Sequence, residues 1–254
     1  MYDPPSYLWA ITIIGVSAIP AATSLLLYIG ARRAGQGRAR AALLAAAAAA
    51  VLGGWFVATA VIAQHGWYHT RFGAGTPWLP VAVTGFLGVV LALAQVPAVK
   101  RAMSAPGMTS RREVPHIFRI AAGFAFLATM ALGHLPALLA VPAGLGDIAT
   151  GVATPLVARA VARGTGRRAA LWLNGVGLAD LINALALGGL FAFVVHVTPA
   201  ATAMTELPLA LVPTAGVPLL IALHITNLRA LTGAPRTTAS ARTRPITGTP
   251  ATAR

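Results

Sequence analysis

The chain has 254 residues, of which 57% are hydrophobic and 9% are charged, and its 19 basic and five acidic side chains give a net charge of +14. Soluble domains carry about 25% charged residues, so this composition excludes an ordinary water-facing domain and indicates a chain surrounded mostly by lipid. The sequence has no cysteine, which excludes disulfides, thiolate metal sites and thiol catalysis. Because the basic residues lie between apolar runs, we expect a lipid bilayer as the partner and no nucleic acid.

Seven apolar runs divide the chain, and each is long enough to cross a bilayer, which takes about 20 residues. No basic residue precedes the first run, so we predict a retained helix instead of a cleaved signal peptide. The fold class expected is an all-α polytopic bundle forming one transmembrane domain over residues 1–231. A tail at 232–254, rich in Thr, Ala, Pro and Arg, is predicted to be disordered. The predicted spans are residues 8–29, 41–63, 79–99, 116–134, 139–158, 169–195 and 208–228.

The basic residues alternate along the chain in a way that predicts its orientation. The segments that follow the first, third, fifth and seventh runs hold four, four, four and five of the 19 basic residues. Cytoplasmic loops carry the excess of Lys and Arg, so we predict an external N-terminus and a cytoplasmic C-terminus in a bacterial plasma membrane. Arg119, near the start of the fourth run, is expected to extend to the inner membrane surface. Residues 135–140 could alternatively form a re-entrant turn.

Two carboxylates fall near the middle of predicted spans. An acid at this depth costs about 2.5–3.5 kcal/mol on insertion scales, so Asp147 and Asp180 should face the bundle interior and find partners. Asp147 shares a helical face with Thr150, Gly151 and Thr154 at spacings of three, four and seven. No basic residue is expected beside either acid. The candidate ion- or ligand-binding residues are Asp147, Asp180, Asn183, Asn174, Thr150 and His224.

These polar positions support two interpretations. In the functional one, the fifth, sixth and seventh helices enclose a proton-, cation- or ligand-binding site. In the structural one, each acid only fastens neighbouring helices through hydrogen bonds. Prolines are frequent in this half of the chain and can free backbone carbonyls for a ligand.

Four histidines map to the predicted outer face and suggest a second kind of site. His65 and His69 are four residues apart, which on a helix would present both rings to one ion. Imidazole suits zinc, copper or an iron-containing cofactor. The candidate metal or haem ligands are therefore His65, His69, His134 and His196, although no cofactor is required by the sequence.

Three stretches, PAGLGDIATG, NGVGLADL and PLALVPTAGVPLLIALHI, resemble stretches of uncharacterised bacterial multi-pass membrane proteins. The resemblance covers roughly the C-terminal half and implies an integral inner-membrane protein without an established activity. Phosphate-binding glycine loops and zinc-protease motifs are absent from the sequence, so no catalytic set is visible. The leading hypothesis is a small transporter or a ligand- or proton-responsive protein. The alternatives are a metal- or haem-dependent redox enzyme and a structural or assembly subunit.

Overall fold

The computed structural model describes residues 3–69, 76–195 and 197–233, and within them it contains helices and no strand. The all-α prediction is therefore confirmed. Seven of the elements described are α-helices of 13 residues or more, and five short α, 3₁₀ or π segments connect or extend them. The elements in order are α1 Ser6–Arg33, α2 Arg38–Gln64, α3 Trp78–Leu93, α4 Pro97–Met103, α5 Met108–Arg111, η1 Val114–Phe118, α6 Arg119–Ala131, α7 Ala137–Ala162, α8 Arg167–Phe193, η2 Ala201–Thr205, η3 Val212–Gly216 and α9 Val217–Thr232.

Six helical segments of the described chain are long and apolar enough to cross a membrane, and there are seven if the bent pair α3 and α4 counts as one. The composition and the helix lengths together are those of a membrane protein. The predicted tail began at residue 232, but Thr232 is the last residue of α9. Residues 234–254 of the predicted tail lie outside the described residues, as does His196. Residues 137–140, within the segment considered as a re-entrant turn, form the first turn of α7.

The third predicted span is shorter than its apolar run. We expected a helix to residue 99, but α3 ends at Leu93, and α4 leaves it at an angle of 81°. Pro97 explains the break, because proline disfavours a helical conformation at the preceding residue. Val96 has an extended backbone, with ψ of 128°, and Pro97 begins α4.

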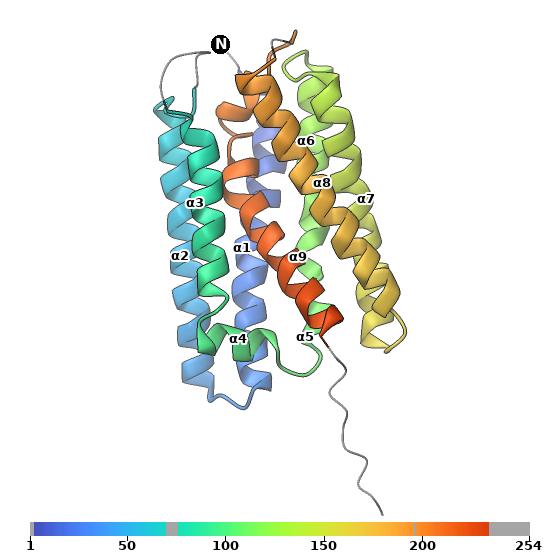
Figure 1. The fold of residues 1–254 in the computed structure, drawn as a ribbon. Helices are drawn as coiled ribbons and strands as arrows, with labels where there is room; N and C mark the ends of the chain where they lie inside the picture. Colours follow the sequence, from blue (N-terminus) through green and yellow to red (C-terminus); the bar gives the residue numbers. More distant parts are fainter. Residues whose placement is uncertain (1–2, 70–75, 196, 234–254) are drawn as a thin grey trace, which may run out of the picture.

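The helices form an elongated bundle in which the arginine-rich segments gather at one end (Figure 1). The turn between α1 and α2, the α4–α5 region, the turn between α7 and α8, and the end of α9 all lie at this end, opposite the start of α1. α7 packs between α6 and α8, while α1 contacts both α2 and α6. This arrangement brings the C-terminal helices together on one side of α1.

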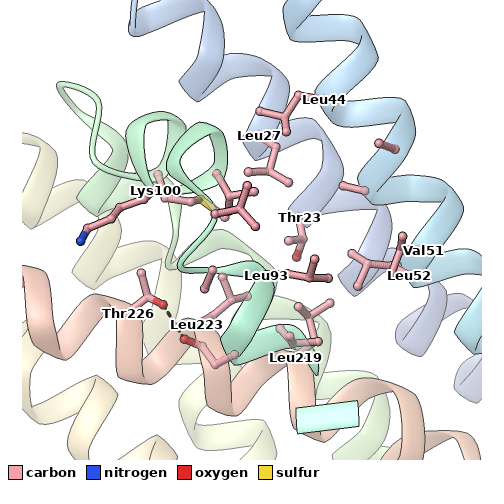
Figure 2. A pocket seen from close by; sticks show the side chains of 18 of the residues that line it. Thr23, Leu27, Leu44, Val51, Leu52, Leu93, Lys100, Leu219, Leu223 and Thr226 are labelled. Atoms are coloured by element: carbon pink, nitrogen blue, oxygen red, sulfur yellow. Dashed lines mark hydrogen bonds between the residues drawn. The ribbon is translucent and has the colours of Figure 1, made fainter. Parts of the chain in front are cut away.

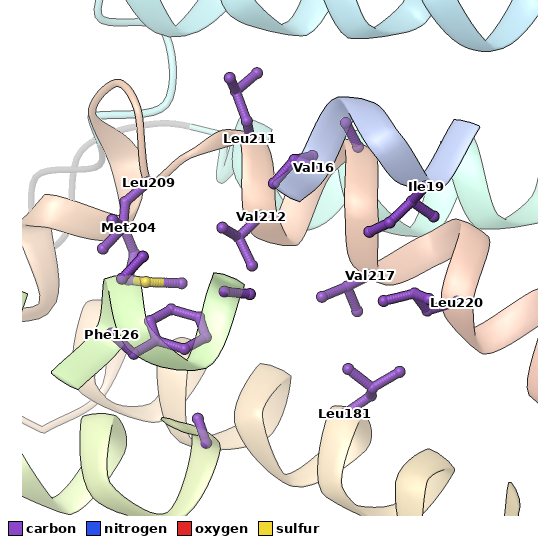
Figure 3. Packing of buried hydrophobic residues seen from close by; sticks show 14 of the residues in the cluster. Val16, Ile19, Phe126, Leu181, Met204, Leu209, Leu211, Val212, Val217 and Leu220 are labelled. Carbon is purple, nitrogen blue, oxygen red and sulfur yellow. The ribbon is translucent and has the colours of Figure 1, made fainter. Parts of the chain in front are cut away.

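The most buried segment is the one predicted as the last span. Residues 208–224 are buried without interruption, and their apolar side chains meet Val16, Phe126 and Leu181 from other helices (Figure 3). Lipid tails are as apolar as these side chains, so moving the side chains from lipid into the bundle gives no hydrophobic gain. The segment is instead stabilised by close packing against the neighbouring helices.

A proline in this central segment is compensated by another helix. Pro218 has no N–H to donate to the carbonyl of Thr214, four residues earlier. Instead the indole Nε1 of Trp55 in α2 donates to that carbonyl over 2.8 Å. The freed carbonyl is thus used for helix packing and not left open for a ligand.

Candidate functional site: a buried arginine between two carboxylates

Arg119, the first residue of α6, lies at the centre of a charged cluster between four helices. Its Nε donates to Asp147 Oδ1 on α7 over 2.7 Å, and its Nη2 donates to Asp180 Oδ2 on α8. Its Nη1 donates to the carbonyl oxygen of Gly177 over 3.1 Å. The Arg119 side chain is 0% exposed, and those of Asp147 and Asp180 are 6% and 13% exposed. One guanidinium therefore joins two acids that are 33 residues apart in the sequence.

This position corrects the sequence-based expectation for Arg119. We expected the side chain to reach the inner membrane surface, and we expected no basic partner for either acid; both expectations are wrong. The planar guanidinium has five N–H donors in a fixed fork, so it can satisfy two carboxylates and a carbonyl together. Both acids are removed from water, and their ion pairs with Arg119 reduce the energetic cost of that burial.

His224 on α9 completes the contacts of Arg119. Its Nε2 lies 3.2 Å from Arg119 Nη1, and its Nδ1 lies 2.9 Å from Asn174 Oδ1. Arginine can only donate, so Nε2 must accept and the proton must sit on Nδ1, which donates to the Asn174 oxygen. The contacts thus select the neutral Nδ1–H tautomer of His224.

Asn174 extends the network from His224 to Glu113. Its Nδ2 donates to Glu113 Oε1 and to the carbonyl of Ala170, each over 2.8 Å. Asn227 Nδ2 donates to Asn174 Oδ1 over 3.3 Å. The same orientation of the Asn174 amide satisfies all of these contacts. A continuous hydrogen-bonded chain therefore runs from the two aspartates through Arg119, His224 and Asn174 to Glu113.

Glu113 and His116 were missed because we assigned this part of the chain to a loop and a helix start. Both residues are 0% exposed. Glu113, His116 and Arg119 are spaced by three, and the 3₁₀ segment η1 connects them. A 3₁₀ helix has three residues per turn, so residues at this spacing share a face. In the sequence this face is indicated by the stretch EVPHIFR, residues 113–119, in which a single acid stands in an otherwise basic segment.

The inner polar atoms of this network are not all satisfied. Glu113 Oε2, Asn227 Oδ1 and both ring nitrogens of His116 are buried and have no hydrogen-bond partner among the described residues. The His116 ring stacks on that of His224, with centroids 3.8 Å apart. Buried polar groups are normally paired, so these atoms mark where a small polar species would gain hydrogen bonds.

Glycines allow the charged side chains to approach the helices. A Cβ built on Gly146 would collide with the Asp180 carboxylate, and one on Gly177 would lie 2.7 Å from a His224 ring carbon and 2.9 Å from Arg119 Nη1. The small residues of α7 and α8 thus make room for the cluster, as small residues do at close helix contacts in membranes.

The structure brings together most, but not all, of the predicted site residues. Asp147, Asp180, Asn174 and His224 belong to one network, and Thr150 is buried one turn from Asp147 on the same helix. Asn183 is exposed on α8 and lies outside the network. The predicted site between the C-terminal helices therefore also includes α6, through Arg119.

His65 and His69, the pair expected to present both rings from one helix, do not share a helix. α2 ends at Gln64, His65 follows as its cap, and Gly66 has a left-handed φ of +71°. His69 Nε2 instead lies 3.7 Å from Glu206 Oε1. Within residues 3–69, 76–195 and 197–233, no group of three or more His, Asp or Glu side chains could hold a metal. Nearby, burial raises the pKa of Tyr68, whose hydroxyl is 2.5 Å from Thr59 Oγ1.

An apolar cavity of about 270 Å³ lies away from this network, among α1, α2, α3, α4 and α9 (Figure 2). Leu27, Leu93 and Leu223 are among the side chains that line it. Thr226 Oγ1 donates to the Ala222 carbonyl over 2.7 Å, and the Lys100 ammonium points away from the apolar side chains (Figure 2). The lining of this cavity is therefore mostly apolar.

Comparison with known families places the network inside a shared domain. A family described as "Domain of unknown function (DUF8737)" matches residues 76–232. The matched region contains every residue of the Arg119 network and excludes α1 and α2. No curated protein and no solved structure matches the chain.

Proposed function

Since the chain belongs to this family of unknown function, we propose from its own geometry that it is a small membrane transporter or ligand-responsive protein that works by binding a proton or cation at the Arg119 cluster. The observation that carries the proposal is one buried guanidinium shared by carboxylates on two different helices. We further propose that the protein sits in a bacterial plasma membrane with its arginine-rich end in the cytoplasm, as the charge distribution favours.

The charge balance of the cluster supports this proposal. Arg119 contributes one positive charge, whereas two ionised aspartates contribute two negative charges. With His224 neutral, the buried cluster has one excess negative charge. An uncompensated charge inside a membrane protein is costly, so one exchangeable proton or monovalent cation would neutralise the site.

The position of the acids links such binding to helix packing. Asp147 belongs to α7 and Asp180 to α8, and each accepts from a different nitrogen of Arg119. A proton or cation on one carboxylate weakens its bond to Arg119 and so loosens one helix relative to α6. A site that is shared between helices in this way can change conformation when its charge changes.

Infrared difference spectroscopy during a pH step tests this function on the full chain in liposomes. The carboxylic C=O band reports protonation, and the amide bands report helix rearrangement. We expect the two signals to appear together in the wild type. Both should be lost in Asp147→Asn and Asp180→Asn, because an amide cannot bind the proton.

Asp3→Asn and Glu206→Gln are the controls for this measurement. Asp3 is exposed near the N-terminus, and Glu206 lies outside the Arg119 network, with its Oε1 3.7 Å from His69 Nε2. Both variants should retain the coupled signals. The proposal would be refuted if the carboxyl and amide signals persisted in both aspartate variants, or if the wild type gave a carboxyl signal without an amide change. The cluster would then serve only to hold the helices together.

A further inference from the structure

A second polar site lies at the arginine-rich end of the bundle. A cavity of about 750 Å³ opens between the α4–α5 region, the turn between α7 and α8, and the end of α9. Three arginines from three separate segments line it: Arg112, Arg167 and Arg229. Ser104 and Thr109 add hydroxyl groups to the same wall. No acidic residue is among its lining residues.

Arg112 shows that this cavity is more than a charged surface. The residue is only 2% exposed, and its Nε is buried without a hydrogen-bond partner. No ion pair joins it to another side chain in the described part of the protein. A buried positive charge without an ion-pair partner is costly, and an anionic group in the cavity would supply that partner.

The acids of the chain do not supply this contact. Glu113 attracts Arg112 electrostatically, but its Oε1 accepts from Asn174, and no Arg112–Glu113 ion pair forms within 4.0 Å. Asp147 and Asp180 are bound to Arg119. Asp3 and Glu206 belong to the segments that precede α1 and follow η2, at the other end of the bundle from the arginine-rich turns.

The other two arginines, Arg167 and Arg229, line the same cavity. Arg167 Nε and Nη2 donate to the Leu231 carbonyl over 3.1 and 2.8 Å, which ties α8 to the end of α9 and leaves further N–H donors on the guanidinium. Arg229 is exposed on the last turns of α9. Arginine forks match the oxygens of a phosphate group, and such charge-assisted hydrogen bonds are the strong ones.

We propose that this cavity is a binding site for a phosphate group, with Arg112 as its buried anchor and Arg167 and Arg229 at its rim. The group can belong to an anionic phospholipid at the membrane surface or to free phosphate. The site is separate from the Arg119 cluster and does not depend on the function proposed for it.

Thermal unfolding of the full chain in an uncharged detergent tests this site. One arm adds inorganic phosphate, and the other adds phosphatidylglycerol with phosphatidylcholine as the uncharged comparison. We expect at least one of the two anionic probes to raise the unfolding temperature in a saturable manner. Arg112→Gln and Arg229→Gln should each weaken that binding by about tenfold or more, since each removes charged hydrogen bonds.

Arg38→Gln is the matched control, because Arg38 is exposed at the same end and does not line the cavity. Stabilisation by phosphatidylglycerol alone identifies a lipid headgroup site, and stabilisation by inorganic phosphate identifies a site for a soluble anion. If neither probe stabilises the protein, or if Arg38→Gln weakens binding as much as the cavity variants do, the proposal is wrong. Should Arg112→Gln fail to fold, unchanged binding by Arg229→Gln decides against the site.

Discussion

Replacing Arg119 with alanine is expected to lower the free energy of unfolding by about 3–5 kcal/mol, the typical cost of removing one partner from a buried ion pair. The substitution leaves Asp147 and Asp180 buried without a positive charge and leaves the Gly177 carbonyl and His224 Nε2 without their donor. Unfolding by a denaturing detergent from mild micelles, followed by circular dichroism, measures the change.

Arg119→Lys should recover only part of this loss. Lysine retains the charge but has one ammonium in place of the planar fork, so it cannot bond both acids and the carbonyl with the same geometry. Arg38→Ala, at an exposed position, should change the unfolding free energy by no more than about 0.5 kcal/mol. An Arg119→Ala protein as stable as the Arg38→Ala protein would contradict the buried ion cluster.

The second large effect is expected at Gly30, where α1 crosses α4. A Cβ on Gly30 would collide with the carbonyl oxygen of Ala102 and would lie 2.8 Å from its carbonyl carbon. Both atoms belong to the backbone and cannot move aside as a flexible side chain can. We therefore expect Gly30→Ala to lower the unfolding free energy by about 1–3 kcal/mol, the usual cost of overpacking.

Gly53→Ala provides the matched control for this contact. Gly53 lies within α2, and a Cβ there would meet no heavy atom within 4 Å. Alanine is the better helix former, so this variant should be as stable as the wild type or more stable by up to about 1 kcal/mol. If the two alanine variants had the same unfolding midpoint, the packing of the bent α3–α4 pair against α1 would be wrong.

The fold was largely predictable because lipid imposes a simple rule on sequence. A helix that crosses a bilayer must be apolar over about 20 residues, so the long runs at α1, α2, α7 and α8 indicated their positions directly. The sequence also contains the cause of the bend after α3, which is Pro97. We missed the bend because the apolar run continues past this proline. Mean hydropathy is calculated over many residues, whereas a proline restricts the backbone of the single residue before it.

The site was only partly predictable, because hydropathy treats each charge separately. Asp147 and Asp180 were recognisable since an acid in a span needs a partner. Arg119 lies close to the end of an apolar run, where arginines usually reach the membrane surface, and nothing in its local pattern showed that it pairs with residues 28 and 61 positions away. Such pairing depends on helix packing, which a single sequence does not reveal.

A double-mutant cycle between Arg119 and Asp147 tests the central claim most directly. The unfolding free energies of the wild type, Arg119→Gln, Asp147→Asn and the double variant give the coupling between the two side chains. The 2.7 Å contact between Arg119 Nε and Asp147 Oδ1 predicts a coupling of about 0.5–3 kcal/mol, with the double variant less destabilised than the sum of the single ones. Single effects that add within about 0.3–0.5 kcal/mol would show that the two residues do not touch, and the account of the cluster would fail.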